Sequence, residues 1–151
     1  RTIARGERLA SSFRNLPPSG GTSLRDAIAS IASSVRTYVF VITDGGDRNS
    51  LIDEETTLRK VSGTKVVIDA IVLGRDTSFL ERMTRTTGGT VARATIATMR
   101  SELHRMLMDI NSRYTVIYQS QGNSSGWRSI AIRPRRRDLS ILNARKGYFA
   151  Q

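Results

Sequence analysis

The sequence predicts an α/β fold, in which a parallel β-sheet carries flanking helices and is followed by a C-terminal antiparallel β-meander. Residues 38–43 and 65–73 are apolar at successive positions rather than alternate ones, as in strands that bury both faces. Helical periodicity lies before, between and after these two strands. Beyond residue 112 the apolar period changes to two, which is typical of strands with one buried face.

The N-terminal part contains two helical patterns. A loose apolar pattern within residues 1–16 predicts a helix that two prolines terminate. A stronger pattern begins at Leu24 and continues to Val35, and Ser23 stands three residues before Asp26, which is the spacing of a capping box. We therefore expect a long, well-capped helix before the first strand.

The segment between the two strands predicts a short helix. Three acidic residues, 53–55, stand at its start and two basic residues, 59–60, stand at its end, before Gly63. This distribution complements the helix dipole. In the following strand, Asp69 interrupts an apolar run, and a buried carboxylate needs a partner that the sequence does not identify.

Two further helices, at 78–86 and 99–110, enclose a short strand at 90–93. Strands that alternate with helices favour a right-handed parallel α/β sheet. After them, we expect antiparallel strands at 114–119, 127–133 and 139–145, with a turn-rich segment between the first two.

Composition places the chain among ordinary globular proteins. It has 151 residues, 38% of them hydrophobic and 25% charged, and it lacks cysteine, which excludes disulfides, thiolate metal sites and cysteine nucleophiles. The chain begins with Arg1, so we expect it to be an interior or processed segment of a longer protein. The net charge is +11, and the densest basic run is 133–137, which we interpret first as a solvated turn between strands.

Thr22 and Asp44 are the candidate metal ligands. Thr22 stands in the loop before a helix, and Asp44 follows directly after the first strand, in Ile42-Thr43-Asp44-Gly45. Loops at the carboxyl edge of a parallel sheet converge on one crevice. A hydroxyl and a carboxylate are hard oxygen donors that suit Mg²⁺. The alternatives are that Thr22 caps the helix and that Asp44 binds local backbone amides.

The same two segments resemble two metal-binding loops of von Willebrand factor type A domains, abbreviated VWFA. The match is to Gly-x-Thr-x-Leu-x-x-Ala, at residues 20–27, and to Ile-Thr-Asp-Gly, at residues 42–45. The Ala144-Arg145-Lys146-Gly147-Tyr148 ending is similar to that of bacterial VWFA-related proteins. The family's Asp-x-Ser-x-Ser loop, which supplies two serine hydroxyls, does not occur in this sequence.

The resemblance implies a partial Rossmann-like sheet in residues 1–112, as the C-terminal portion of a VWFA domain, and a β-strand extension in residues 113–151. It implies a non-enzymatic, adhesion-type module that binds a protein partner through a carboxylate. It also implies a metal-ion-dependent adhesion site with Mg²⁺ in the intact parent, although we expect no tight binding by this chain alone. Proteins of this type are commonly exported. The missing first strand would lie beside residues 38–43.

The sequence raises two other functions. The basic run at 133–137 could bind nucleic acid or an anionic membrane, but nucleic acid is disfavoured because only Trp127 lies nearby to stack a base. A Rossmann-like enzyme is disfavoured because no acid–base or nucleotide-binding motif can be assembled. His104 is the single histidine, and a lone histidine is more often structural than a ligand.

Overall fold

The structure is a computed structural model that describes residues 20–31, 35–119 and 125–150. It has the predicted α/β architecture, with a three-stranded parallel sheet and a separate two-stranded antiparallel sheet. The predicted helix within residues 1–16 lies outside the described residues. The described elements, in chain order, are α2 (Leu24–Ser30), β1 (Thr37–Thr43), α3 (Glu54–Ser62), β2 (Val66–Val72), α4 (Ser78–Thr87), β3 (Val91–Arg93), α5 (Met99–Asn111), β4 (Gly126–Ser129) and β5 (Gly147–Ala150).

The parallel sheet has the order β1-β2-β3, with Thr37 opposite Val66 and Ala70 opposite Val91. All seven residues of the central strand β2 are buried, whereas β1 is partly exposed along its length. This difference follows from position, because β1 has a strand on only one side among the described residues. A further strand beside β1 stays a prediction.

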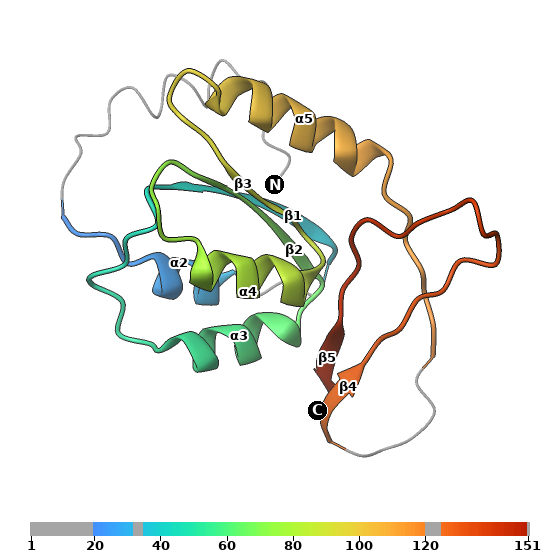
Figure 1. Ribbon diagram of the computed structural model, residues 1–151. Helices are drawn as coiled ribbons and strands as arrows, with labels where there is room; N and C mark the ends of the chain where they lie inside the picture. The colour runs from blue at the N-terminus through green and yellow to red at the C-terminus, as the bar shows by residue number, and fades with distance from the viewer. Residues whose placement is uncertain (1–19, 32–34, 120–124, 151) are drawn as a thin grey trace.

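Helices cover both faces of this sheet (Figure 1). The helices α2, α3 and α4 lie on one face, where they form the main apolar core against alternate residues of β2. The large side chains of this core that are at most 2% exposed are Ile28, Ile68, Leu80 and Met83. The helix α5 covers the opposite face, and its Met106 is fully buried.

Helix α3 begins and ends as its charges predict. Asp53 is the N-cap, and its carboxylate accepts hydrogen bonds from the Thr56 amide at 2.7 Å and the Thr56 hydroxyl at 3.0 Å. Helix α2 differs from the prediction. It ends at Ser30, five residues before Val35, which is 69% exposed. The N-cap Ser23 makes no capping hydrogen bond through its side chain. The Asp26 amide, which a capping box would direct to Ser23, donates instead to the Ser50 hydroxyl at 3.1 Å.

Asp69, the charged residue within β2, is fully buried and ion-paired with Arg113. The two guanidinium nitrogens of Arg113 donate to the two carboxylate oxygens, at 2.8 and 3.1 Å. Thr90 donates to the same carboxylate from its amide at 2.8 Å and from its hydroxyl at 2.9 Å. This ion pair ties the segment after α5 to the centre of the sheet.

The predicted three-stranded meander is wrong in its details. Residues 114–119 and 139–145 form no strand, and the one antiparallel ladder among the residues that the structure describes joins β4 to β5. Trp127 stands opposite Phe149, with ring centroids 5.1 Å apart in an edge-to-face arrangement. The aromatic ring of Tyr114, which its place in the alternating pattern would let fill a core, is 93% exposed.

Arg145 attaches this C-terminal extension to the α/β layer. Its guanidinium donates to the carbonyl oxygens of Ser62 at 2.7 Å, Thr64 at 3.0 Å and Thr86 at 3.2 Å. These carbonyls lie at or just beyond the C-terminal ends of α3 and α4, where the helix dipole is negative and carbonyls lack helical partners. Burial lowers the pKa of the Arg145 guanidinium.

Candidate functional site

The loop that contains Thr22 lies directly against the loop that follows β1. The carbonyl oxygen of Thr22 accepts hydrogen bonds from the backbone amides of Arg48 and Asn49, each at 3.1 Å. Thr22 precedes α2, and Asp44 follows the last residue of β1. The structure therefore brings together the two loops that the sequence predicted to converge at this edge of the sheet.

Carboxylates at the start of α2 and in the facing loop hold the two loops in place. Asp47 accepts from the Arg25 amide at 2.8 Å and pairs with the Arg25 guanidinium at 3.0 Å. It also accepts from the Ser50 amide at 3.1 Å and the Ser50 hydroxyl at 2.8 Å. Asp26 accepts from the amides of Leu51 and Ile52. Asp26 thus joins the loops instead of closing a capping box.

The electrostatics of Asp47 reflect this structural role. Burial raises the pKa of its carboxyl, but the hydrogen bonds from Arg25 and Ser50 outweigh burial, so the pKa lies below its ordinary value. In the sequence, Asp47, Asn49 and Ser50 follow Asp44, where they could add outer-sphere contacts to a metal ion or form a polar turn and helix cap. The structure gives Asp47 and Ser50 hydrogen bonds that fix the loop.

Asp44 occupies a turn at the end of β1. Its Oδ1 atom accepts a hydrogen bond from the Gly46 amide at 3.0 Å, as in an Asx turn. The Asp44 carbonyl approaches Gly74 so closely that a Cβ at position 74 would lie 1.8 Å from that oxygen. The loop after β2 thus packs against Asp44, and position 74 requires glycine.

The two candidate ligand side chains are both exposed and largely uncommitted. Within the described ranges, the Thr22 hydroxyl makes no hydrogen bond, and the Asp44 carboxylate accepts only the bond from Gly46. Thr22 does not cap α2, because the N-cap position is that of Ser23, the residue after it, and the Ser23 side chain makes no capping hydrogen bond either. The turn role considered for Asp44 is present, but it uses one of the two carboxylate oxygens.

We call the edge of the sheet that carries Thr22 and Asp44 the rim. The oxygen atoms of these two side chains supply some of the ligands that a divalent cation needs. A threonine hydroxyl and a carboxylate oxygen are acceptable ligands for Mg²⁺, which takes six oxygen ligands and commonly keeps several waters. No group of three or more histidine, cysteine, aspartate or glutamate side chains suited to a metal occurs in the part of the chain that the structure describes. Thr22 and Asp44 could therefore supply a minority of the ligands.

Comparisons with protein-family models, with curated proteins and with solved structures find no match.

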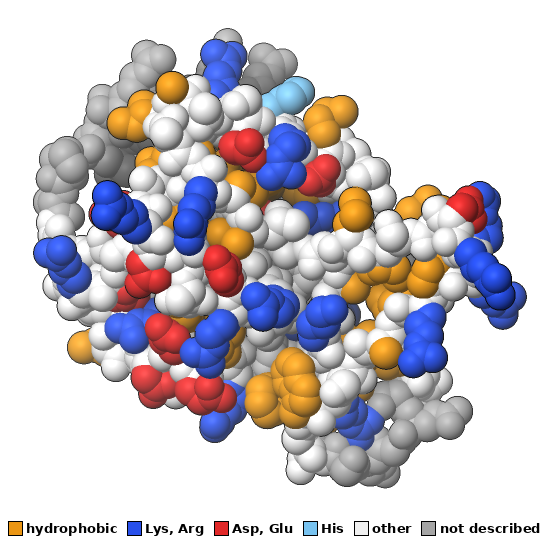
Figure 2. Space-filling model, viewed as in Figure 1, with side chains coloured by type: hydrophobic (Ala, Val, Ile, Leu, Met, Phe, Trp, Pro, Cys, Tyr) orange, Lys and Arg blue, Asp and Glu red, His pale blue; other side chains and the backbone are white. Residues whose placement is uncertain are grey.

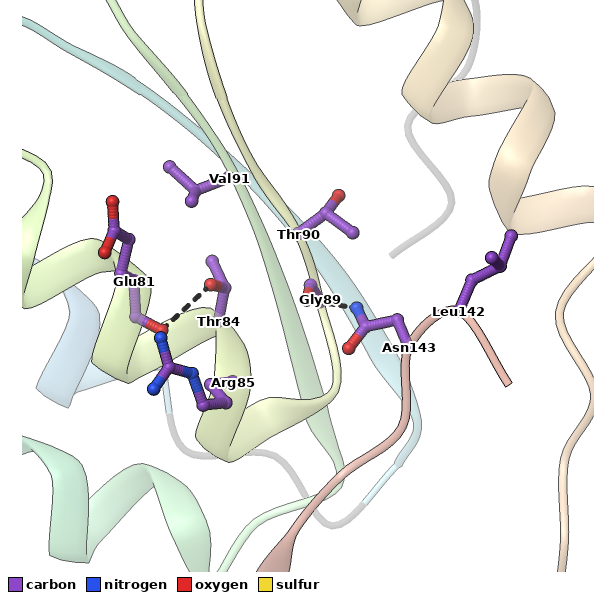
Figure 3. Close-up of a pocket in the computed structure, with 8 residues that line it drawn as sticks. All are labelled: Glu81, Thr84, Arg85, Gly89, Thr90, Val91, Leu142 and Asn143. Carbon is purple, nitrogen blue, oxygen red and sulfur yellow. Dashed lines mark hydrogen bonds between the residues drawn. The ribbon is translucent and has the colours of Figure 1, made fainter. Parts of the chain in front are cut away.

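A pocket that contains neither Thr22 nor Asp44 lies where the C-terminal extension meets α4 and β3 (Figure 3). It is a shallow, open pocket of about 280 Å³, lined by side chains of α4, by residues 89–91 and by Leu142 and Asn143. The Asn143 amide donates to the carbonyl oxygens of Gly88 and Gly89. Sequence reasoning missed this pocket, because one wall comes from a segment more than fifty positions along the chain.

The remaining sequence candidates lie on the surface. His104 is exposed on α5. Arg133, Arg135 and Arg137 are exposed in the segment between β4 and β5. Among the described helices, none combines the length and the apolar character that a membrane span requires.

Proposed function

We propose that this chain is a non-enzymatic protein-binding module whose binding surface is the rim at the carboxyl end of β1. The observation that carries the proposal is the hydrogen bonding of the Thr22 carbonyl to the Arg48 and Asn49 amides, which joins the Thr22 loop to the Asp44 loop. Ligands of open α/β sheets bind outside the carboxyl ends of the strands. The rim therefore has the position expected of a binding site.

The chemistry of the rim favours a metal-dependent contact with a partner. The Thr22 hydroxyl and the second carboxylate oxygen of Asp44 are exposed and carry no protein hydrogen bond within the described residues. These two atoms would hold Mg²⁺, directly or through water. A site with one carboxylate leaves the ion with positive charge, which attracts a carboxylate of a partner protein.

The proposal extends to a longer protein that also contains an Asp-x-Ser-x-Ser loop. In such a protein, the two serine hydroxyls and the Thr22 hydroxyl would be neutral oxygen ligands, and the Asp44 carboxylate would be an anionic one. Without those hydroxyls, two side chains and water chelate the ion weakly, and we expect an affinity on the order of millimolar for the present chain.

Paramagnetic Mn²⁺ tests the site in the 151-residue chain, because it broadens the NMR signals of nearby amides. We expect broadening to be strongest for residues 21–23 and 44–46, and we expect Asp44→Asn to remove most of it. Glu55→Gln is the matched control, since it neutralises an exposed carboxylate on α3. Broadening that Asp44→Asn leaves unchanged, or that centres on α3, would refute the proposed site.

A further inference from the structure

The segment between β4 and β5 projects away from the sheet as a long excursion (Figure 1). We define residues 130–142 as the arginine loop. All of its residues from 131 to 142 are exposed. The Ile130 amide donates to the Lys146 carbonyl at 2.8 Å at the base of the excursion, and Arg145 fixes the returning segment to α3 and α4. The loop is therefore held outward by anchored ends.

The tip of the arginine loop is strongly cationic. Arg136 pairs with Asp138, and both side chains of this pair are largely exposed. Arg133, Arg135 and Arg137 form no ion pair with any other described residue. Three uncompensated guanidinium groups thus stand close together on a projecting segment, where their mutual repulsion is relieved by an anionic partner.

Aliphatic side chains flank these arginines and are also exposed. Their exposed fractions are 45% for Ile132, 53% for Leu139, 42% for Ile141 and 95% for Leu142. Figure 2 shows the basic side chains on the outer part of the projecting lobe, with hydrophobic side chains next to them. A solvated turn explains the arginines alone, but it gives no reason for the exposed leucines and isoleucines.

We propose that the arginine loop docks onto the surface of an anionic phospholipid bilayer. Guanidinium groups bind lipid phosphates, and the adjacent leucine and isoleucine side chains enter the boundary between headgroups and acyl chains. The combination favours lipid over nucleic acid, because single-stranded nucleic acid is held by stacking on aromatic rings. The loop contains no aromatic residue, and Trp127, outside it, packs edge-to-face against Phe149.

Vesicle flotation of the 151-residue chain tests this inference. We expect binding to vesicles of equal parts phosphatidylcholine and phosphatidylserine, and no binding to phosphatidylcholine alone. Each arginine near an anionic surface contributes a factor of about five in affinity. The triple change Arg133→Gln, Arg135→Gln and Arg137→Gln is therefore expected to weaken binding on the order of a hundredfold.

A charge-matched control separates the loop from the overall positive charge. Arg59→Gln, Arg85→Gln and Arg100→Gln remove three exposed arginines from the helices, and we expect a much smaller loss of vesicle binding. Leu142→Ser is expected to weaken vesicle binding about tenfold. It should leave any binding of a single-stranded oligonucleotide unchanged.

Three results would overturn the inference. The first is vesicle binding that both triple variants weaken equally. The second is vesicle binding that survives the loop variant. The third is a chain that binds the oligonucleotide through the three loop arginines and does not bind the vesicles. None of these outcomes depends on the proposed metal rim, because Asp44 is unchanged in every variant.

Discussion

The buried pair of Asp69 and Arg113 allows a quantitative test of what holds the C-terminal half on the sheet. Replacing Arg113 by methionine keeps most of the apolar stem and removes the charge. Among the described residues, the fully buried Asp69 carboxylate would then retain only its two hydrogen bonds from Thr90. Removing one partner of a buried ion pair costs about 3–5 kcal/mol.

We expect a loss of about 3 kcal/mol in the free energy of unfolding, at the lower end of that range, because Thr90 still donates two hydrogen bonds to the carboxylate. Domains of this size have free energies of unfolding of roughly 5–15 kcal/mol, so the loss is a large fraction of the total stability. Urea titration followed by circular dichroism measures it as a shift of the midpoint at constant slope.

Two further variants make the test specific. Adding Asp69→Asn to Arg113→Met removes the unpaired charge and should restore part of the lost stability. Arg105→Met removes two exposed ion pairs on α5, with Glu102 and Asp109, and should cost less than about 1 kcal/mol. The reasoning is refuted if Arg113→Met costs no more than Arg105→Met, or if the added Asp69→Asn lowers stability further.

Two more stability predictions concern the helix ends and the loops of the rim. Arg145→Lys should lower the free energy of unfolding by about 2 kcal/mol, because an ammonium cannot reach three carbonyls, whereas Lys146→Ala at an exposed position should change it little. Urea midpoints that shift equally in both variants would contradict this role. The depressed pKa of Asp47 means that its stabilising contribution is present above the unfolded pKa of about 3.9 and is lost as pH falls through the lower folded pKa. Below about pH 4, wild type should therefore lose stability faster than Asp47→Asn, and parallel losses in acid urea titrations would refute this.

The elements of the α/β layer were predictable because burial determines the pattern of apolar residues along each of them. Strand β2 is buried on both faces and is apolar at every position but one, so its type can be read from composition. Helix α3 carries its own start signal in Asp53 and its charges at the expected ends. The residues within each of these elements were sufficient to predict it, since side chains that share a face recur every few positions along a helix or strand.

The partner of Asp69 was not predictable, because the two residues are far apart in the sequence. Arg113 lies 44 residues further along the chain, beyond the helices α4 and α5 and the strand β3, and no local pattern distinguishes it from other arginines. The rim, too, was predictable in its position but not in its hydrogen bonds. Sequence placed Thr22 and Asp44 at one edge, but it did not indicate that Asp47 would bond to Arg25 instead of facing a ligand. A carboxylate's function depends on which donors the fold brings to it.

The C-terminal extension shows why a period of two is insufficient to define a sheet. Alternation predicts which side chains share a face, but it does not predict which strand pairs with which. The pairing in the structure follows from two anchors that lie two residues apart. Arg145 binds the ends of α3 and α4, and Gly147 begins β5 where a Cβ would lie 2.4 Å from the ring of Trp127. Arginine and glycine at this spacing thus fix where β5 starts and place it against β4, which gives the Arg-Lys-Gly-Tyr ending a structural purpose.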